Sequence, residues 1–102
     1  MKKAIYPGTF DPITFGHIDL IKKSLNIFDQ VIVAVSDGNT KNYLFDANER
    51  EHLIKKALFS DLKFSKKKII VTSFKTLTTD FCKKMKSNVI IRGLRATSDF
   101  EY

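Results

Sequence analysis

The chain has 102 residues, 43% of them hydrophobic and 28% charged, which predicts one small globular domain. No apolar run approaches the length of a membrane span, and the N-terminus has no apolar core like that of a secretory signal, so we expect a cytoplasmic protein with no membrane partner. The net charge of +7 favours anionic small-molecule partners, whereas scattered lysine pairs without a basic tail or interleaved aromatics do not predict nucleic-acid binding.

The first predicted strand covers 3–7 (KAIYP), and a helix is predicted after the loop that follows it. This helix has one apolar face, whose residues recur at helical spacing: Ile18, Ile21, Leu25 and Phe28. Because Gly16 and His17 stand just before that face, we expect them at the amino end of the helix. The loop between strand and helix therefore presents its polar residues beside a helix N-terminus.

Three further strands are predicted from apolar runs rich in Val and Ile, over 31–36, 68–74 and 88–93. A helix is predicted to start at DANE (46–49), where the first Asp caps it and the Glu completes a capping box. Two helical faces lie between the later strands: Leu53, Ile54, Ala57 and Leu58, then Leu77, Phe81 and Met85. This βαβαβαβ order predicts an α/β fold, a Rossmann-like open parallel sheet with flanking helices.

The single cysteine, Cys82, excludes an internal disulfide and a zinc site made of several cysteines. It stands between apolar residues at helical spacing, which favours a packed core thiol over a reactive one. The last residues, RATSDFEY (95–102), are typical of the opening of a helix that is then cut short. We therefore expect 1–102 to be a single domain that is incomplete at its C-terminus.

The loop sequence GTFDPITFGH, 8–17, has the residue types of a phosphate site. In open parallel sheets ligands bind beyond the carboxyl ends of the strands, where this loop is expected. Gly8 would allow a close approach or a sharp turn, Thr9 and Thr14 supply hydroxyl donors, and His17 can donate to a phosphate oxygen at the helix N-terminus. The same residues also fit a turn with helix caps, with His17 merely on the surface.

Two arginines, Arg92 and Arg95, directly follow the last predicted strand. The chain is rich in lysine, so two arginines within four residues favour bidentate contacts with phosphate. Because the carboxyl ends of parallel strands share one edge, we expect these guanidinium groups and His17 to meet around one anionic pocket. By contrast, His52 lies in the middle of a predicted helix and is expected to be solvated, and Asp11 is expected to cap or orient its loop.

Three stretches resemble bacterial phosphopantetheine adenylyltransferases of the nucleotidyltransferase α/β superfamily. The string YPGTFDPITFGHIDLI contains TFGH (14–17), which is similar to the family's T/H-x-G-H motif, and IIRGLRATSDFEY (90–102) is similar to its R-G-L-R segment. Lys41, in NTKNYLFDANER, matches a lysine that the family places before a helix. The three stretches occur in the family's order, and the resemblance covers the whole chain.

The resemblance implies direct, in-line transfer of the adenylyl group of ATP to 4′-phosphopantetheine, with Mg²⁺ and without a covalent enzyme intermediate. The products would be dephospho-coenzyme A and pyrophosphate, in the penultimate step of coenzyme A biosynthesis. The family assembles as homohexamers, so the resemblance also implies a homo-oligomer. Its members continue past DFEY with an acidic ATP contact and a Ser/Thr-rich phosphate loop, which this sequence does not contain.

The same resemblance implies a set of site residues. Those implied in catalysis are His17 and Lys41. Those implied in binding the acceptor substrate are Thr9, Lys41, Thr78 and Arg92. Those implied in binding ATP are Thr9, Phe10, His17, Gly93, Leu94 and Arg95. Without the resemblance, Lys41 would be one surface charge among many, and Thr78 fits a helix start equally well.

Two other functions remain open from the sequence. One is a different nucleotidyltransferase of the same superfamily, such as one acting on nicotinamide mononucleotide or forming a cytidylyl product, although RGLR followed by DFEY argues against it. The other is a noncatalytic fragment that binds a nucleotide or phosphate, which the short C-terminus favours. Two residues depart from the family pattern: Phe15, which is expected to have little effect, and Asn42, where relatives often have a second basic residue.

Overall fold

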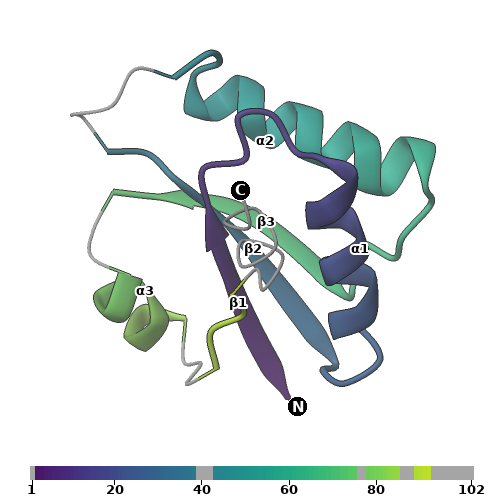
Figure 1. Cartoon of the computed structure of the whole chain (residues 1–102). Coiled ribbons are helices and arrows are strands. Elements are labelled where there is room, and N and C mark those ends of the chain that lie inside the picture. The colour runs from purple at the N-terminus through teal and green to yellow at the C-terminus, as the bar shows by residue number, and fades with distance from the viewer. Residues whose placement is uncertain (1, 39–42, 76–77, 86–88, 93–102) are drawn as a thin grey trace, which may run out of the picture.

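A computed structural model describes residues 2–38, 43–75, 78–85 and 89–92 of the chain (Figure 1). Its elements, in chain order, are β1 (Lys3–Gly8), α1 (Phe15–Ser24), β2 (Gln30–Ser36), α2 (Ala47–Lys55), the π-helical segment η1 (Lys56–Asp61), β3 (Ile69–Phe74) and α3 (Thr78–Lys84). The predicted alternation of strands and helices is confirmed. After α2, the π-helical segment η1 continues the helix as far as Asp61.

The three strands form one parallel sheet in the order β1-β2-β3. The register pairs Ile5 with Ile32, and Ile32 with Ile70. Residues 31–35 of β2 are completely buried, as expected for a central strand that has both faces covered. The continuous apolar run of β2 therefore follows from its place between β1, β3 and the helices.

The fourth predicted strand, 88–93, is reduced within residues 89–92 to one parallel bridge between Ile5 and Ile90. Two hydrogen bonds make this bridge: the Ile5 N–H donates to the carbonyl of Val89 over 2.9 Å, and the Ile91 N–H donates to the carbonyl of Ile5 over 2.7 Å. The bridge uses the edge of β1 that does not face β2. The spatial order is therefore 89–92, β1, β2, β3, which is a Rossmann-like arrangement.

Two apolar cores lie on opposite faces of the sheet. On one face, α1 and α2 cover the sheet (Figure 1), and Ile21, Ile54 and Leu58 pack with Val31 and Val33. On the other face, α3 packs through Phe81, whose ring stacks on that of Phe74 at 4.8 Å between centroids. Successive strand residues lie alternately in the two cores, because side chains along a strand point to opposite faces of the sheet.

Both long helices begin with a capping box. In α2, the Glu49 backbone N–H donates to the Asp46 carboxylate over 2.8 Å, and the Asp46 N–H donates back to the Glu49 carboxylate over 3.2 Å. The cap predicted from DANE is therefore confirmed. The cap of α1 involves Thr14 and His17 and belongs to the candidate site described below.

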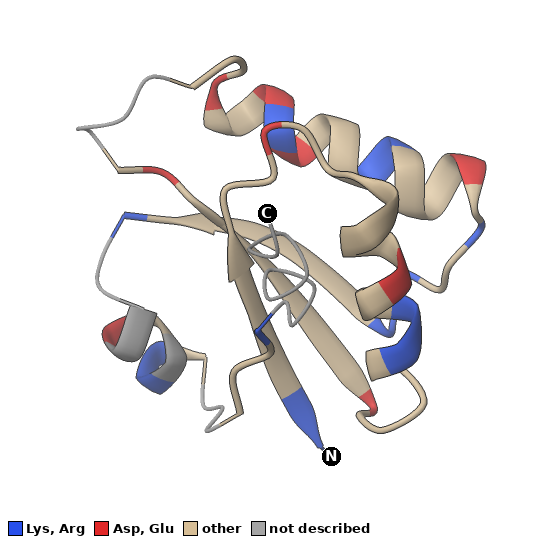
Figure 2. Ribbon diagram, viewed as in Figure 1, with Lys and Arg blue, Asp and Glu red and all other residues tan. Residues whose placement is uncertain are grey.

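The lysine pairs noted in the sequence, and the three consecutive lysines 66–68, lie on the surface. Lysines 22, 23, 55, 56, 66–68, 83 and 84 are all exposed, and Figure 2 shows basic and acidic residues spread along the outer sides of the helices and the loops. Within the described ranges, none of the helices has the length and apolar character needed to cross a membrane.

The α2 core contact gives a first prediction. Ile54→Ala removes a side chain that is completely buried between α2 and the sheet, so the free energy of unfolding should fall by about 2–5 kcal/mol. On the same helix, His52→Ala removes an exposed side chain. It should change the free energy of unfolding by less than about 0.5 kcal/mol. Urea denaturation of both variants would measure this, and equal losses would contradict the packing described here.

Candidate functional site

The candidate site lies where the strand order reverses. From β1 the chain moves outward to β2 and β3, and it returns to the opposite side of β1 at Ile90. The loop after β1 and the segment after Ile90 therefore leave neighbouring parallel strands at the same end of the sheet. Crevices at such reversal points are the usual ligand sites of open α/β sheets.

Arg92 is placed at this end of the sheet by the strand pairing. It follows Ile90 by two residues, so the register of the bridge sets it level with Pro7, next to the start of the loop at Gly8. The Arg92 side chain is exposed. Strand pairing thus brings Arg92 and the loop to one edge, and the pocket that they were expected to share stays a prediction.

His17 is the third residue of α1 and completes its capping box. The backbone N–H of Thr14 donates to Nδ1 of His17 over 3.0 Å, and the His17 N–H donates to the hydroxyl oxygen of Thr14 over 3.4 Å. Because Nδ1 accepts this hydrogen bond, the neutral imidazole carries its proton on Nε2. The cap interpretation of this loop is confirmed, and the same cap makes Nε2 a hydrogen-bond donor.

Aromatic contacts hold the His17 ring in place. The ring meets Phe10 edge to face at 4.8 Å between centroids, and meets Tyr6 at 6.2 Å. Tyr6 and Phe10 themselves form an edge-to-face pair at 5.2 Å. A ring with its Nδ1 engaged and two aromatic rings against it has little freedom to turn, so the Nε2 donor has a fixed direction.

Gly8 has a packing role that the sequence did not predict. Its φ angle is not in the left-handed region, but a Cβ at this position would lie 3.0 Å from the Phe10 ring. The residue with a left-handed backbone is Phe10, with φ of 48°, and its side chain is only 1% exposed. The glycine therefore makes room for a buried ring, and that ring anchors a strained loop.

Asp11 orients its loop, as predicted. Its carboxylate accepts the backbone N–H of Leu44 over 2.5 Å and that of Phe45 over 2.9 Å. These hydrogen bonds tie the loop after β1 to the segment that leads into α2. The two carboxylate oxygens of Asp11 thus have a structural function.

Arg50 is the functional candidate that the sequence analysis missed. Its side chain is completely buried, and its guanidinium donates to the carbonyls of Thr9, Ser36 and Phe45 over 2.9, 2.8 and 3.0 Å. It also lies 3.5 Å from a carboxylate oxygen of Asp37. One signal was available in the sequence: the chain has only three arginines among its 18 basic residues, and only the other two were noticed.

Several predicted site residues lie outside the described part of the chain. They are Lys41, Gly93, Leu94 and Arg95. Thr78 is the first residue of α3, but the structure does not describe its side chain or that of Cys82. His52 is exposed on α2, as expected.

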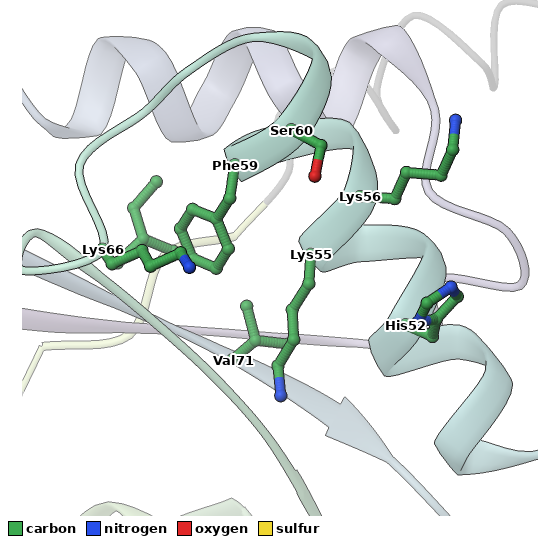
Figure 3. A pocket seen from close by; sticks show the side chains of 8 residues that line it. His52, Lys55, Lys56, Phe59, Ser60, Lys66 and Val71 are labelled. Atoms are coloured by element: carbon green, nitrogen blue, oxygen red, sulfur yellow. The ribbon is translucent and has the colours of Figure 1, made fainter.

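A separate groove of about 650 Å³ lies between α2, η1 and β3 (Figure 3). Its lining combines basic and apolar side chains: His52, Lys55, Lys56, Phe59, Ser60, Lys66, Ile69 and Val71. Ile69 is the first residue of β3, so the groove reaches toward the amino end of that strand. It therefore lies away from the reversal point, and none of the predicted site residues lines it.

Comparisons with known proteins agree with this fold. The model of the cytidylyltransferase-like family matches residues 5–102. The chain is 73% identical, over its whole length, to phosphopantetheine adenylyltransferase from Pelagibacter ubique (strain HTCC1062). The chain spans 63% of the length of that relative. The resemblance seen in the sequence motifs is thereby confirmed.

Solved structures support the same fold. Nicotinic acid mononucleotide adenylyltransferase from Plasmodium falciparum, complexed with NaAD, is 29% identical with a TM-score of 0.67, over 84% of this chain and 46% of that chain. A bifunctional NMN adenylyltransferase/ADP ribose pyrophosphatase from Francisella tularensis, complexed with AMP and a manganese ion, is 20% identical with a TM-score of 0.69, over 85% of this chain and 29% of that chain.

The capping box predicts the protonation of His17. Above the pKa of the ring, Nε2 should carry the proton and Nδ1 should be bare, because Nδ1 accepts the Thr14 N–H. The ¹⁵N chemical shifts of the imidazole, measured by NMR at pH 8, distinguish the two tautomers. The exposed His52 serves as a control and should show a mixture of tautomers. A His17 protonated mainly on Nδ1 would contradict the capping geometry.

Proposed function

Since the chain belongs to the cytidylyltransferase-like family, we propose that the protein transfers the adenylyl group of ATP to 4′-phosphopantetheine. The products are dephospho-coenzyme A and pyrophosphate. The observation that carries this proposal is the 73% identity with a phosphopantetheine adenylyltransferase over the whole chain. The placement of the loop after β1 and of Arg92 at one reversal point supports it independently.

The chemistry needs oriented donors more than it needs a base. The acceptor phosphate is already an anionic nucleophile, and charge builds up on the transferring phosphate as the barrier is crossed. In the proposed mechanism, the Nε2–H of His17 donates to an oxygen of that phosphate, beside the positive end of the α1 dipole. The Thr14 cap and the Phe10 ring fix the direction of this donor before the substrate arrives.

The other residues implied by the family resemblance complete the proposed site. Thr9 binds the phosphates of both substrates, and the Phe10 backbone contacts the nucleotide. Lys41 and Arg92 neutralise the acceptor phosphate, and Lys41 also stabilises the developing charge. Thr78 contacts the pantetheine arm. The segment Gly93, Leu94 and Arg95 binds ATP.

We propose that Mg²⁺ enters as the complex of ATP with the ion, as part of the substrate. Among the residues that the structure describes, no group of three His, Cys, Asp or Glu side chains could hold a metal ion, and Asp11 uses its carboxylate for the backbone of Leu44 and Phe45. Phosphate oxygens and water are the ligands that Mg²⁺ usually keeps at such sites. The Francisella structure with AMP and manganese supports a divalent cation in this fold.

We also propose that the full-length protein is a cytoplasmic homohexamer, as the family resemblance implies. A different acceptor, a pyridine mononucleotide such as nicotinamide mononucleotide, is the second candidate function. The observation that favours this class of acceptor is the 29% identity with the Plasmodium nicotinic acid mononucleotide adenylyltransferase. The much higher identity to the phosphopantetheine enzyme favours the first.

The function can be tested directly. The full-length product of the gene, incubated with ATP, Mg²⁺ and 4′-phosphopantetheine, should release pyrophosphate and form dephospho-coenzyme A, detected by coupled assay and mass spectrometry. Nicotinamide mononucleotide in place of 4′-phosphopantetheine should give no product. Turnover only with nicotinamide mononucleotide would support the second candidate. Binding of ATP without turnover on either acceptor would overturn both.

His17 should contribute mainly to the transition state. His17→Ala should lower kcat by about 10²–10³-fold and change KM for both substrates much less, because its contact strengthens as charge develops on the phosphate. His52→Ala is the matched control, since it removes an exposed imidazole that belongs to α2 and not to the loop after β1, and its kcat should stay unchanged. Equal effects of His17→Ala on KM and kcat would argue against the proposed role.

A further inference from the structure

Arg50 is a buried cation whose contacts are mostly backbone carbonyls. The side chain is completely buried, and within the described residues the carboxylate paired with it is that of Asp37, which is 3.5 Å away and itself 27% exposed. Buried charges are costly, and buried ion pairs are weak evidence of a contribution to stability. The contacts of Arg50 therefore suggest a function other than holding the core together.

Two of these contacts join β1 to β2 at the point where their pairing ends. The last pair of the register is Gly8 with Val35, so Thr9 and Ser36 are the next residues on the two strands. One nitrogen of Arg50, Nη1, donates to both carbonyls, over 2.9 Å to Thr9 and 2.8 Å to Ser36. The guanidinium thus fixes the backbone at the carboxyl end of the sheet, beside the candidate site.

The hydrogen bond from Arg50 to the Thr9 carbonyl sets the direction of the Phe10 N–H. The peptide bond between Thr9 and Phe10 is trans, so its C=O and N–H point in opposite directions. With the carbonyl turned toward Arg50, the Phe10 N–H is turned away from the buried guanidinium. Among the residues that the structure describes, this N–H has no hydrogen-bond partner.

Phe10 needs outside support for this arrangement. A φ of 48° is uncommon for a residue with a large side chain and costs about 1–3 kcal/mol. The buried ring supports the loop from one side, and the hydrogen bond from Arg50 to Thr9 supports it from the other. The guanidinium also donates to Phe45, the residue whose N–H is held by Asp11, so the loop after β1 is tied twice to the same segment.

We propose that Arg50 is a positioning residue for adenylyl transfer, which rests on the proposed function above. It touches no substrate. It holds the Thr9–Phe10 peptide so that the Phe10 N–H donates to an oxygen of the transferring phosphate, next to the Nε2–H of His17. Arg50, a buried cation on α2, thereby orients a backbone hydrogen-bond donor, the Phe10 N–H, in the loop after β1.

Kinetics of two Arg50 variants of the full-length protein test this proposal. Arg50→Lys keeps the charge but loses the planar set of donors, and Arg50→Met loses both. Turnover is expressed per ATP-binding site, counted by calorimetry. Arg50→Lys should lower kcat per site by about 10²-fold, with KM changed less than about threefold, and Arg50→Met should lower kcat further.

Ile54→Ala is the matched control, because it weakens the same helix from a completely buried position without removing the hydrogen bond from Arg50 to Thr9. Its kcat per ATP-binding site should stay within about twofold of wild type, although its stability falls. A merely structural Arg50 would behave like this control. Unchanged kcat per site in Arg50→Lys would therefore overturn the proposal.

A second measurement needs no variant. In the wild-type protein, ATP should shift the NMR resonance of the Phe10 amide and slow its hydrogen exchange. An unperturbed Phe10 amide in the presence of bound ATP would overturn the proposal even if the Arg50 variants do not fold. A perturbed amide in a protein without transferase activity would instead refute the proposed function and leave Arg50 as the residue that orients a phosphate donor.

Discussion

The buried guanidinium of Arg50 is the interaction on which the carboxyl end of this sheet depends. It joins the carbonyls that end β1 and β2 to the segment before α2, and the Asp11 carboxylate ties the same segment to the loop after β1. Each of these contacts joins a charged side chain to a backbone group, and the backbone group has a direction fixed by the chain. They give the loop one geometry before any ligand is present, and such preorganisation is what electrostatic stabilisation of a transition state requires.

Chain topology supplies the other half of the site. The return of the chain to the free edge of β1 at Ile90 sets Arg92 beside the loop, although the two are distant in the sequence. A single capping box then has two functions: it starts α1, and it fixes the proton of His17 on Nε2. Fold and chemistry are therefore linked by a few local hydrogen bonds at one edge of the sheet.

Much of this fold could be predicted from periodicity and caps. The apolar runs gave β1, β2 and β3 to within one or two residues, and DANE gave the start of α2, because these signals are local. The fourth strand was harder: its pairing with β1 is long-range, and only the bridge at Ile90 lies in the described residues. The motifs located the loop and His17, but Arg50 looked like any basic residue on a helix, since its burial depends on three segments that meet only in the folded chain. The packing constraint on Gly8 could not be predicted either, because the Phe10 ring that fills its space folds back onto it only in three dimensions.

The most direct test of this account is a crystal structure of the full-length protein with Mg²⁺ and a non-hydrolysable ATP analogue. The account predicts the α-phosphate within hydrogen-bond distance of both Nε2 of His17 and the Phe10 N–H, with Arg50 still bound to the Thr9 carbonyl. A triphosphate bound instead in the lysine-lined groove between α2 and β3, with the loop after β1 empty, would contradict it.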